Sequence, residues 1–247
     1  MFYKVIACEI AVRELCYAAA RSRNLIDLEF LTQGYHDIPA TGRAEMQKRI
    51  DAVPAGKYDA ILLGYGLCGN GLDGLIARHT ALVLPRAHDC IALLMGSRER
   101  YQQYFDGNQG VYFRSTGWLE RGENLEQQTL QTVKKKTGVG HTLAELIERY
   151  GEENGQYLFE QFTAYQNTYH QLTYIATGLE PDGSFEQRAR EEAARRGWAF
   201  DLVAGDLRLF ERLLSGDWPE EEFLVVPPGW RVTATYDSNV IGKEPAA

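Results

Sequence analysis

Short apolar runs alternate with amphipathic stretches along most of this chain, and this alternation limits the possible fold more than any other feature. Four apolar runs in the first third have the length and composition of buried strands: residues 4–7, 25–31, 58–64 and 81–84. Apolar residues at helical spacing predict three helices between or after these strands: residues 9–23, 43–52 and 91–105. Strands that alternate with helices predict an α/β fold with a parallel, Rossmann-like sheet flanked by helices.

The alternation stops in the middle of the chain and then returns. Residues 121–170 are predicted to form a helical insertion, with helices that start at Thr142 and at Gln156. Beyond it, the pattern predicts further strands and helices: strands at 172–178, 199–203 and 223–227, and helices at 185–196 and 207–214. The fragments ALVLPRAHD and FLVVPPGWR are alike, which suggests two pseudo-symmetric halves, residues 1–120 and 171–247, within one compact unit.

Composition excludes several classes of protein. The 247 residues are 45% hydrophobic and 24% charged, as in ordinary globular proteins, and the formal net charge is -8. An acidic chain repels nucleic acid, so we expect no nucleic-acid partner. No apolar segment approaches the roughly 18 residues of a membrane span, and the start of the chain lacks the pattern of a signal peptide. We therefore expect a cytoplasmic protein without a membrane partner.

All four cysteines lie in the first ninety residues. Cys8 ends the first predicted strand, Cys68 follows the third, and Cys90 follows the fourth. Ligands of parallel sheets bind at the carboxyl ends of the strands, so these three thiols are expected at one rim. Cys16 shares a helical face with apolar residues, and we expect it to pack in the core.

Three thiols and a nearby imidazole predict a metal site. Cys8, Cys68 and Cys90 are the expected ligands, with His88 as the fourth, because cysteine and histidine suit zinc. Three thiolates also suit an iron–sulfur cluster, which stays the alternative cofactor. The competing interpretation is that the three cysteines only pack as buried side chains and that His88 bonds to a carbonyl or to Asp89. As catalytic candidates we take His88, Asp89 and Glu9, although a carboxylate at Glu9 also suits the first turn of a helix.

The loop GYGLCG matches the dinucleotide-binding pattern G-x-G-x-x-G, with Gly64, Gly66 and Gly69 at the glycine positions. That pattern needs a full crossover helix, but only about ten residues separate the loop from the next strand. We therefore expect the glycines to let the backbone approach a ligand or metal closely, with Asn70 and Arg86 as polar contacts to the bound group. A metal-free nucleotide-binding protein is kept as an alternative.

Several motifs together resemble an uncharacterised bacterial and archaeal family that is known only as a domain of unknown function. They are GYGLCGNGL, PRAHDCI, GSRERY, the GW pair and the early CE pair, and they span most of the first 120 residues. Members of that family are often associated with corrinoid and one-carbon methyl-transfer systems. The resemblance implies a small-molecule substrate or a corrinoid methyl-transfer partner protein.

His88 and Cys90 are also similar to the His-x-Cys pattern of zinc methyltransferases of the cobalamin-independent methionine synthase type, in which zinc activates a substrate thiol. In those larger barrels the other cysteine lies downstream, whereas Cys8 and Cys68 lie upstream here. A common mechanism would be convergent. The expected function is a metal-dependent transferase or an accessory protein of one-carbon metabolism; the alternative is a non-catalytic carrier of a metal or cluster.

Overall fold

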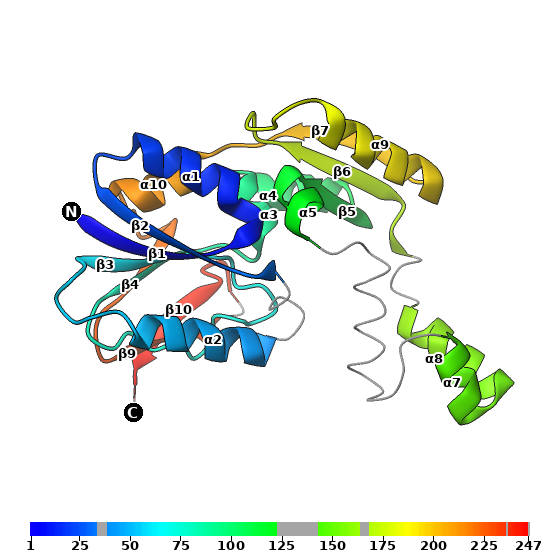
Figure 1. Ribbon diagram of the computed structural model, residues 1–247, viewed down its shortest axis with the longest axis horizontal. Coiled ribbons are helices and arrows are strands. Elements are labelled where there is room, and N and C mark those ends of the chain that lie inside the picture. Colours follow the sequence, from blue (N-terminus) through cyan, green and yellow to red (C-terminus); the bar gives the residue numbers. More distant parts are fainter. Residues whose placement is uncertain (34–38, 123–142, 164–167, 236, 247) are drawn as a thin grey trace.

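The computed structural model describes residues 1–33, 39–122, 143–163, 168–235 and 237–246 (Figure 1). The main sheet has five strands: β1 (Phe2–Cys8), β2 (Leu25–Leu31), β3 (Ala60–Gly64), β4 (Leu82–Pro85) and β8 (Phe223–Val226). Their order is β2-β1-β3-β4-β8, and only the last pair, β4 and β8, is antiparallel. The predicted α/β fold with a parallel, Rossmann-like sheet is confirmed.

A second sheet has three parallel strands, in the order β5-β6-β7: β5 (Val111–Ser115), β6 (Gln171–Ala176) and β7 (Ala199–Ala204). Two further strands form an antiparallel ribbon: β9 (Trp230–Ala234) and β10 (Ile241–Pro245). The sequence pattern did not predict β5, β9 or β10. Charged residues interrupt all three, so none of them reads as the continuous apolar run that marks a buried strand.

Helices connect the strands, and most of them begin within about four residues of the predicted positions, but the helix at Thr116–Arg121 was not predicted. The helices of the first half are η1 (Glu9–Ala11), α1 (Val12–Arg21), α2 (Pro39–Asp51), α3 (Cys90–Leu94), α4 (Arg98–Gly107) and α5 (Thr116–Arg121). The later ones are α7 (Leu143–Tyr150), α8 (Glu152–Thr163), α9 (Ser184–Arg196) and α10 (Arg208–Ser215). The expected helical insertion thus contains α7 and α8, while Thr142, the predicted start of its first helix, lies outside the described residues. No helix in the described ranges is long and apolar enough to cross a membrane.

The main sheet is covered on both faces, because successive residues of a strand point to opposite sides. On one face, Val5 and Ala7 pack with α1 and α10. On the other face, Ile6 packs with α2 and with the β9–β10 ribbon. Figure 1 shows this arrangement, with α1 and α10 on one side of the sheet and α2 and the ribbon on the other.

The two sheets do not follow the predicted halves. β5 comes from the first 120 residues but pairs with β6, whereas β8 comes from the end of the chain and pairs with β4. The two similar fragments, ALVLPRAHD and FLVVPPGWR, contain β4 and β8. Their likeness reflects two neighbouring buried strands of one sheet, with Leu82 opposite Val226 and Pro85 opposite Phe223.

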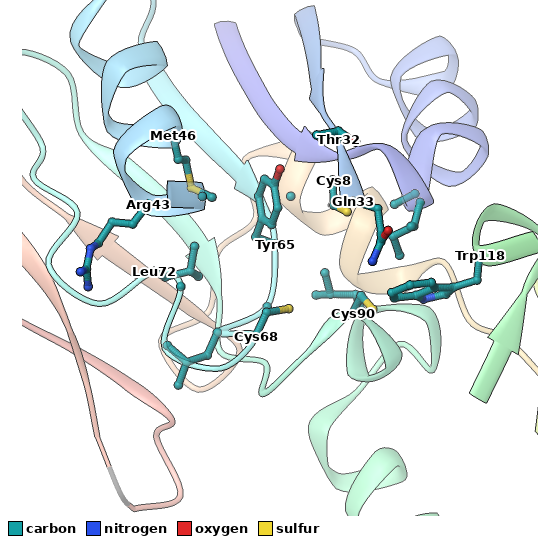
Figure 2. A pocket seen from close by; sticks show the side chains of 18 of the residues that line it. Cys8, Thr32, Gln33, Arg43, Met46, Tyr65, Cys68, Leu72, Cys90 and Trp118 are labelled. Atoms are coloured by element: carbon teal, nitrogen blue, oxygen red, sulfur yellow. The ribbon is translucent and has the colours of Figure 1, made fainter. Parts of the chain in front are cut away.

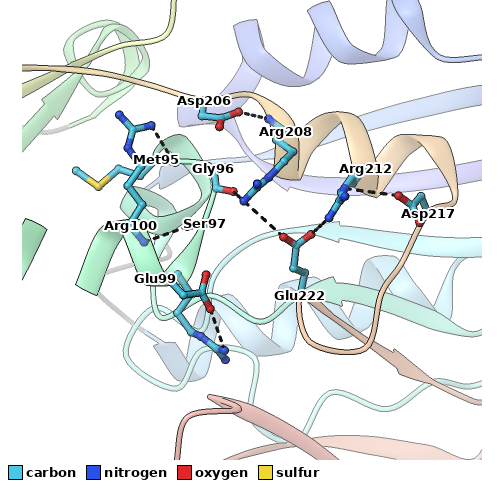
Figure 3. Close-up of polar contacts among 11 residues, drawn as sticks. Met95, Gly96, Ser97, Glu99, Arg100, Asp206, Arg208, Arg212, Asp217 and Glu222 are labelled. Carbon is cyan, nitrogen blue, oxygen red and sulfur yellow. Dashed lines mark hydrogen bonds and ion pairs between the residues drawn. The ribbon is translucent and has the colours of Figure 1, made fainter. Parts of the chain in front are cut away.

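The helix predicted at residues 91–105 is divided into α3 and α4. Gly96 separates them with a φ of +76°, a left-handed backbone conformation that costs glycine little. Arg208, at the start of α10, donates to the Gly96 carbonyl oxygen at 2.9 Å and pairs with Glu222, just before β8 (Figure 3). This turn therefore fixes α3 relative to α10 and to the last strand of the main sheet.

The prediction that Cys16 packs in the core is wrong, because its side chain is exposed. The buried face of α1 instead carries Leu15 and Ala18, together with the carboxyl group of Glu14. Glu14 is 1% exposed and accepts a hydrogen bond from Thr177. The helix is rotated so that this carboxyl group faces the second sheet, and Cys16 is left on the outer side.

Candidate functional site

A pocket lies at the carboxyl ends of β1 and β3, beside the start of α3. It has a volume of about 40 Å³, and Cys8, Cys68 and Cys90 are among the residues that line it (Figure 2). Cys8 is the last residue of β1, Cys68 lies in the loop after β3, and Cys90 is the first residue of α3. Three residues far apart in the sequence therefore reach one pocket, because parallel strands end at the same edge of a sheet.

Burial keeps these three thiols protonated near neutral pH. It raises the pKa of Cys8 to about 11. Burial, followed by the negative charge of Asp89, raises the pKa of Cys68 to about 12. The pKa of Cys90 is raised well above its ordinary value by burial and by the charge of Cys68, while a hydrogen bond from Trp118 opposes the rise. A cation bound between the sulfurs would reverse this preference, since it favours the thiolate form.

The sulfur atoms of the three cysteines are not arranged around a common point where a metal ion would bind. No group of three or more His, Cys, Asp or Glu side chains in the described ranges is placed to hold a metal ion. His88, expected as the fourth ligand, is exposed and is not among the residues that line the pocket. Its backbone carbonyl oxygen accepts a hydrogen bond from the Cys68 N–H at 2.8 Å. The structure thus brings the three cysteines to the pocket but leaves the imidazole at the surface.

Asp89 holds Cys90 in place. Its Oδ1 accepts hydrogen bonds from the backbone N–H groups of Ile91 and Ala92, so that it caps α3. Its Oδ2 accepts a hydrogen bond from the Tyr101 hydroxyl at 3.1 Å. Both oxygens are therefore engaged in positioning the helix that begins with Cys90.

Glu9 binds the two residues that follow β2. Its Oε1 accepts hydrogen bonds from the Thr32 hydroxyl at 2.8 Å and from the Gln33 N–H at 2.9 Å. Its Oε2 lies 3.5 Å from Arg121. The carboxylate is thus saturated by three partners, and it orders the two residues that follow β2.

The glycines of the GYGLCG loop serve close backbone packing. A Cβ atom at Gly64 would lie 2.7 Å from Ala7 Cβ, and one at Gly66 would lie 2.5 Å from the Asp89 carbonyl carbon. Gly69 has a φ of +64° and stands between Cys68 and Asn70, whose φ values are +44° and +65°. Three successive left-handed residues form a tight turn that directs Cys68, at a cost in backbone strain.

No helix follows this loop, although the dinucleotide-binding pattern requires one. Residues 68–74 form turns, and the chain from residue 65 leads to β4 without a helical segment. Without a helix, the loop lacks the N-terminal N–H groups that bind a pyrophosphate. The G-x-G-x-x-G match therefore occurs in a different structural setting.

Two of the expected cofactor contacts lie away from the pocket. Asn70 is exposed, and its backbone carbonyl accepts a hydrogen bond from the Asp73 N–H. Arg86 donates to backbone carbonyl oxygens of Glu220, Asn239 and Ile241, and so joins β4 to the end of the chain. Neither residue is among those that line the cysteine pocket.

Sequence reasoning missed Gln33, which lines the same pocket. Its side chain is 2% exposed, and its Nε2 has no hydrogen-bond partner among the residues that the structure describes. Figure 2 shows this amide beside Cys8, with its nitrogen directed toward the side of the pocket that holds Cys90 and Trp118. Gln33 follows the carboxyl end of β2. The rule that ligands bind at the carboxyl ends of parallel strands, which identified the cysteines, would therefore have identified this residue as well.

The fold and the site define a Rossmann-like α/β protein with a three-thiol pocket at the edge of its main sheet. The chain belongs to the family described as "Protein of unknown function (DUF1638)", whose model matches residues 30–214. Cys68 and Cys90 lie within the matched part, and Cys8 precedes it. Searches of curated proteins and of solved structures found no match.

Proposed function

We propose that Cys8, Cys68 and Cys90 bind one metal centre, and that the protein acts as a transferase or accessory protein in one-carbon, corrinoid-linked methyl transfer. Zinc is the proposed metal, and an iron–sulfur cluster is the alternative. The observation that carries the proposal is the convergence of three thiols from three separate segments on one pocket. Such thiols are soft ligands, and a reducing compartment such as the cytoplasm keeps them free to bind metal.

Electrostatics supports this assignment. Besides burial, the charges of Cys68, Asp89 and Cys8 raise the pKa of Cys90, so this thiol is sensitive to the charge on the other two sulfurs. Arg43 is the one cationic side chain among the described lining residues, and it donates to the Asp73 carbonyl oxygen. A divalent cation would supply the charge that three thiolates need in a pocket of this kind.

Metal binding requires the sulfurs to move closer together than they stand here. The segment best suited to this movement is the left-handed turn of Cys68, Gly69 and Asn70, whose conformation stores strain. The cap formed by Asp89 would keep Cys90 fixed while Cys68 approaches. With His88 at the surface, the fourth coordination position would be open to a ligand from solution, as in catalytic zinc sites. Bound zinc would supply Lewis acidity at that position.

The test is the metal content of protein purified without oxygen, measured by elemental analysis and absorption spectroscopy. The expected result is about one zinc per chain and a colourless solution, or a brown protein if a cluster is bound. Protein that contains neither zinc nor iron, that takes up neither when they are added, and in which all four thiols titrate freely would contradict the proposal.

A second measurement separates a transferase from a carrier. The loaded protein is mixed with a zinc-free competitor protein of known affinity, and the rate of zinc loss is followed. An enzyme is expected to keep its zinc through repeated gel filtration with the competitor. Rapid and complete transfer would favour the carrier function over the transferase.

A further inference from the structure

The inside of the cysteine pocket shows which chemical class of ligand it suits. Apart from the three thiols, most of its wall is apolar, and large apolar side chains supply much of that surface, among them Ile10, Met46, Leu67, Leu72, Leu93 and Phe210. A volume of about 40 Å³ leaves room for only a few heavy atoms. The pocket therefore suits a small ligand with an apolar body.

Charge restricts the ligand further. No acidic side chain lies among the described lining residues, and the guanidinium of Arg43 is bound to the Asp73 carbonyl oxygen. Figure 2 shows Arg43 on the far side of the pocket from Cys8 and Cys90, directed away from them. A charged ligand would lose its hydration without gaining a counter-charge, which is costly.

Gln33 places a polar side-chain amide in the lining of the pocket. It is 2% exposed, and its Nε2 makes no hydrogen bond within the described part of the chain. A buried amide N–H without a partner is costly, and a ligand acceptor atom would satisfy it. The backbone N–H of Gln33 donates to Glu9, which fixes the point from which this side chain enters the pocket lining.

We infer that the pocket binds a small, uncharged molecule, whose polar atom accepts a hydrogen bond from the Gln33 amide while its soft atom lies against the cysteines. This inference rests on the proposed metal centre for the contact at the soft atom. The contact with Gln33 does not depend on a metal. The amide and the apolar wall then select the ligand, and the metal centre holds it.

Three thiols of similar size test the charge preference: 2-mercaptoethanol is uncharged, thioglycolate is anionic and cysteamine is cationic. Binding to zinc-loaded protein is measured by calorimetry without oxygen. We expect 2-mercaptoethanol to bind at least about tenfold more tightly than either charged thiol. Equal or tighter binding of thioglycolate or cysteamine would overturn the inference.

Substitution of Gln33 tests the hydrogen bond. Gln33→Met keeps the length of the side chain and removes the amide, so we expect about five- to tenfold weaker binding of 2-mercaptoethanol. Zinc content should not change. Gln102→Met is the matched control, since Gln102 is an exposed glutamine of α4, away from the pocket. Unchanged affinity in Gln33→Met would contradict the assigned role of Gln33.

Nuclear magnetic resonance of the wild-type protein gives a result that does not depend on a variant. On addition of 2-mercaptoethanol, the side-chain amide signals of Gln33 should shift, and those of Gln102 should not. Absence of a shift at Gln33 would contradict the inference. Zinc-free protein should show the same order of the three thiols with weaker binding, so failure to bind zinc would contradict the proposed function without deciding the ligand class.

Discussion

Gly117 lies so close to the backbone of Ile10 that a Cβ atom at position 117 would be 1.6 Å from the Ile10 carbonyl oxygen. Ile10 belongs to η1, the short helix that begins directly after Cys8. Gly117 belongs to α5, the helix that begins directly after β5 of the second sheet. The contact therefore joins the two sheets next to the pocket. It also places Trp118, the following residue, in the pocket lining.

Gly117→Ala is expected to destabilise the protein by about 1–3 kcal/mol, because the added methyl group meets backbone that cannot move aside alone. Urea unfolding measures the change. Gly107→Ala is the control: it lies in α4 with no atom within 4 Å of an added Cβ, so we expect unchanged or slightly higher stability. Equal stability of the two variants would show that α5 is not held by this contact.

The cysteines should separate into two classes. Cys68→Ser replaces a thiol in the pocket by a hydroxyl that stays protonated, so the folded variant should lose its zinc. Cys16→Ser changes an exposed side chain and should alter the free energy of unfolding by less than about 0.5 kcal/mol, with full zinc content. Elemental analysis of both folded variants checks the prediction, which fails if both keep the same zinc content.

The raised thiol pKa values predict a loss of stability in alkaline solution. An unperturbed cysteine has a pKa of about 8.5, whereas the pKa of Cys8 is about 11 and that of Cys68 about 12 in the folded chain. The unfolded chain loses these protons first. The stabilisation is therefore complete below about pH 8.5 and decreases as the pH rises toward the folded values.

The measurement is urea unfolding of zinc-free protein, at several pH values from about 8 to 10.5. Tyrosines also have raised pKa values in this fold, so the wild type is compared with Cys68→Ala. The free energy of unfolding should fall less steeply with pH in the variant than in the wild type. Parallel curves would mean that the pKa of Cys68 is not raised in the folded chain.

Glu9→Ala tests a positioning role. The change removes the acceptor of the Thr32 hydroxyl and of the Gln33 N–H, so Gln33 should lose its fixed orientation. We expect about fivefold weaker binding of 2-mercaptoethanol with zinc content unchanged. Glu29→Ala is the control, because Glu29 lies on β2, the strand that leads to Gln33, but pairs with Lys4 and Arg49 instead. If both variants bind 2-mercaptoethanol with similar affinity, Glu9 does not position Gln33.

Apolar runs in the sequence predicted β1–β4 and β6–β8 well. The signature is continuous in β3 and β4, which are buried at every residue, as expected for strands covered on both faces. β5 was missed, since Arg114 interrupts its pattern. In the folded chain this arginine is buried in an ion pair with Glu192 of α9, at 3.0 Å. The ion pair with Glu192, 78 residues further along the chain, allows Arg114 to lie in a buried strand. The pattern of residues around Arg114 gives no information about this partner.

The position of the cysteines at strand ends followed from a general rule of parallel sheets, and it brought Cys8, Cys68 and Cys90 to one pocket. The orientation of single side chains did not follow from it. His88 and Cys90 are two residues apart, yet the turn before α3 leaves His88 exposed while Cys90 is buried. Gln33 carried no motif, and the lack of a partner for its Nε2 within the described part of the chain becomes evident only when its surroundings are known.

The antiparallel pairing of β4 with β8 has a consequence for synthesis on the ribosome. β4 ends at Pro85, but the strand that covers its free edge begins only at Phe223. While the intervening residues are being made, the main sheet presents an apolar edge with unpaired backbone groups, which is a template for association between chains. Chains released before Phe223 are therefore expected to aggregate, even though they already contain all three cysteines of the pocket.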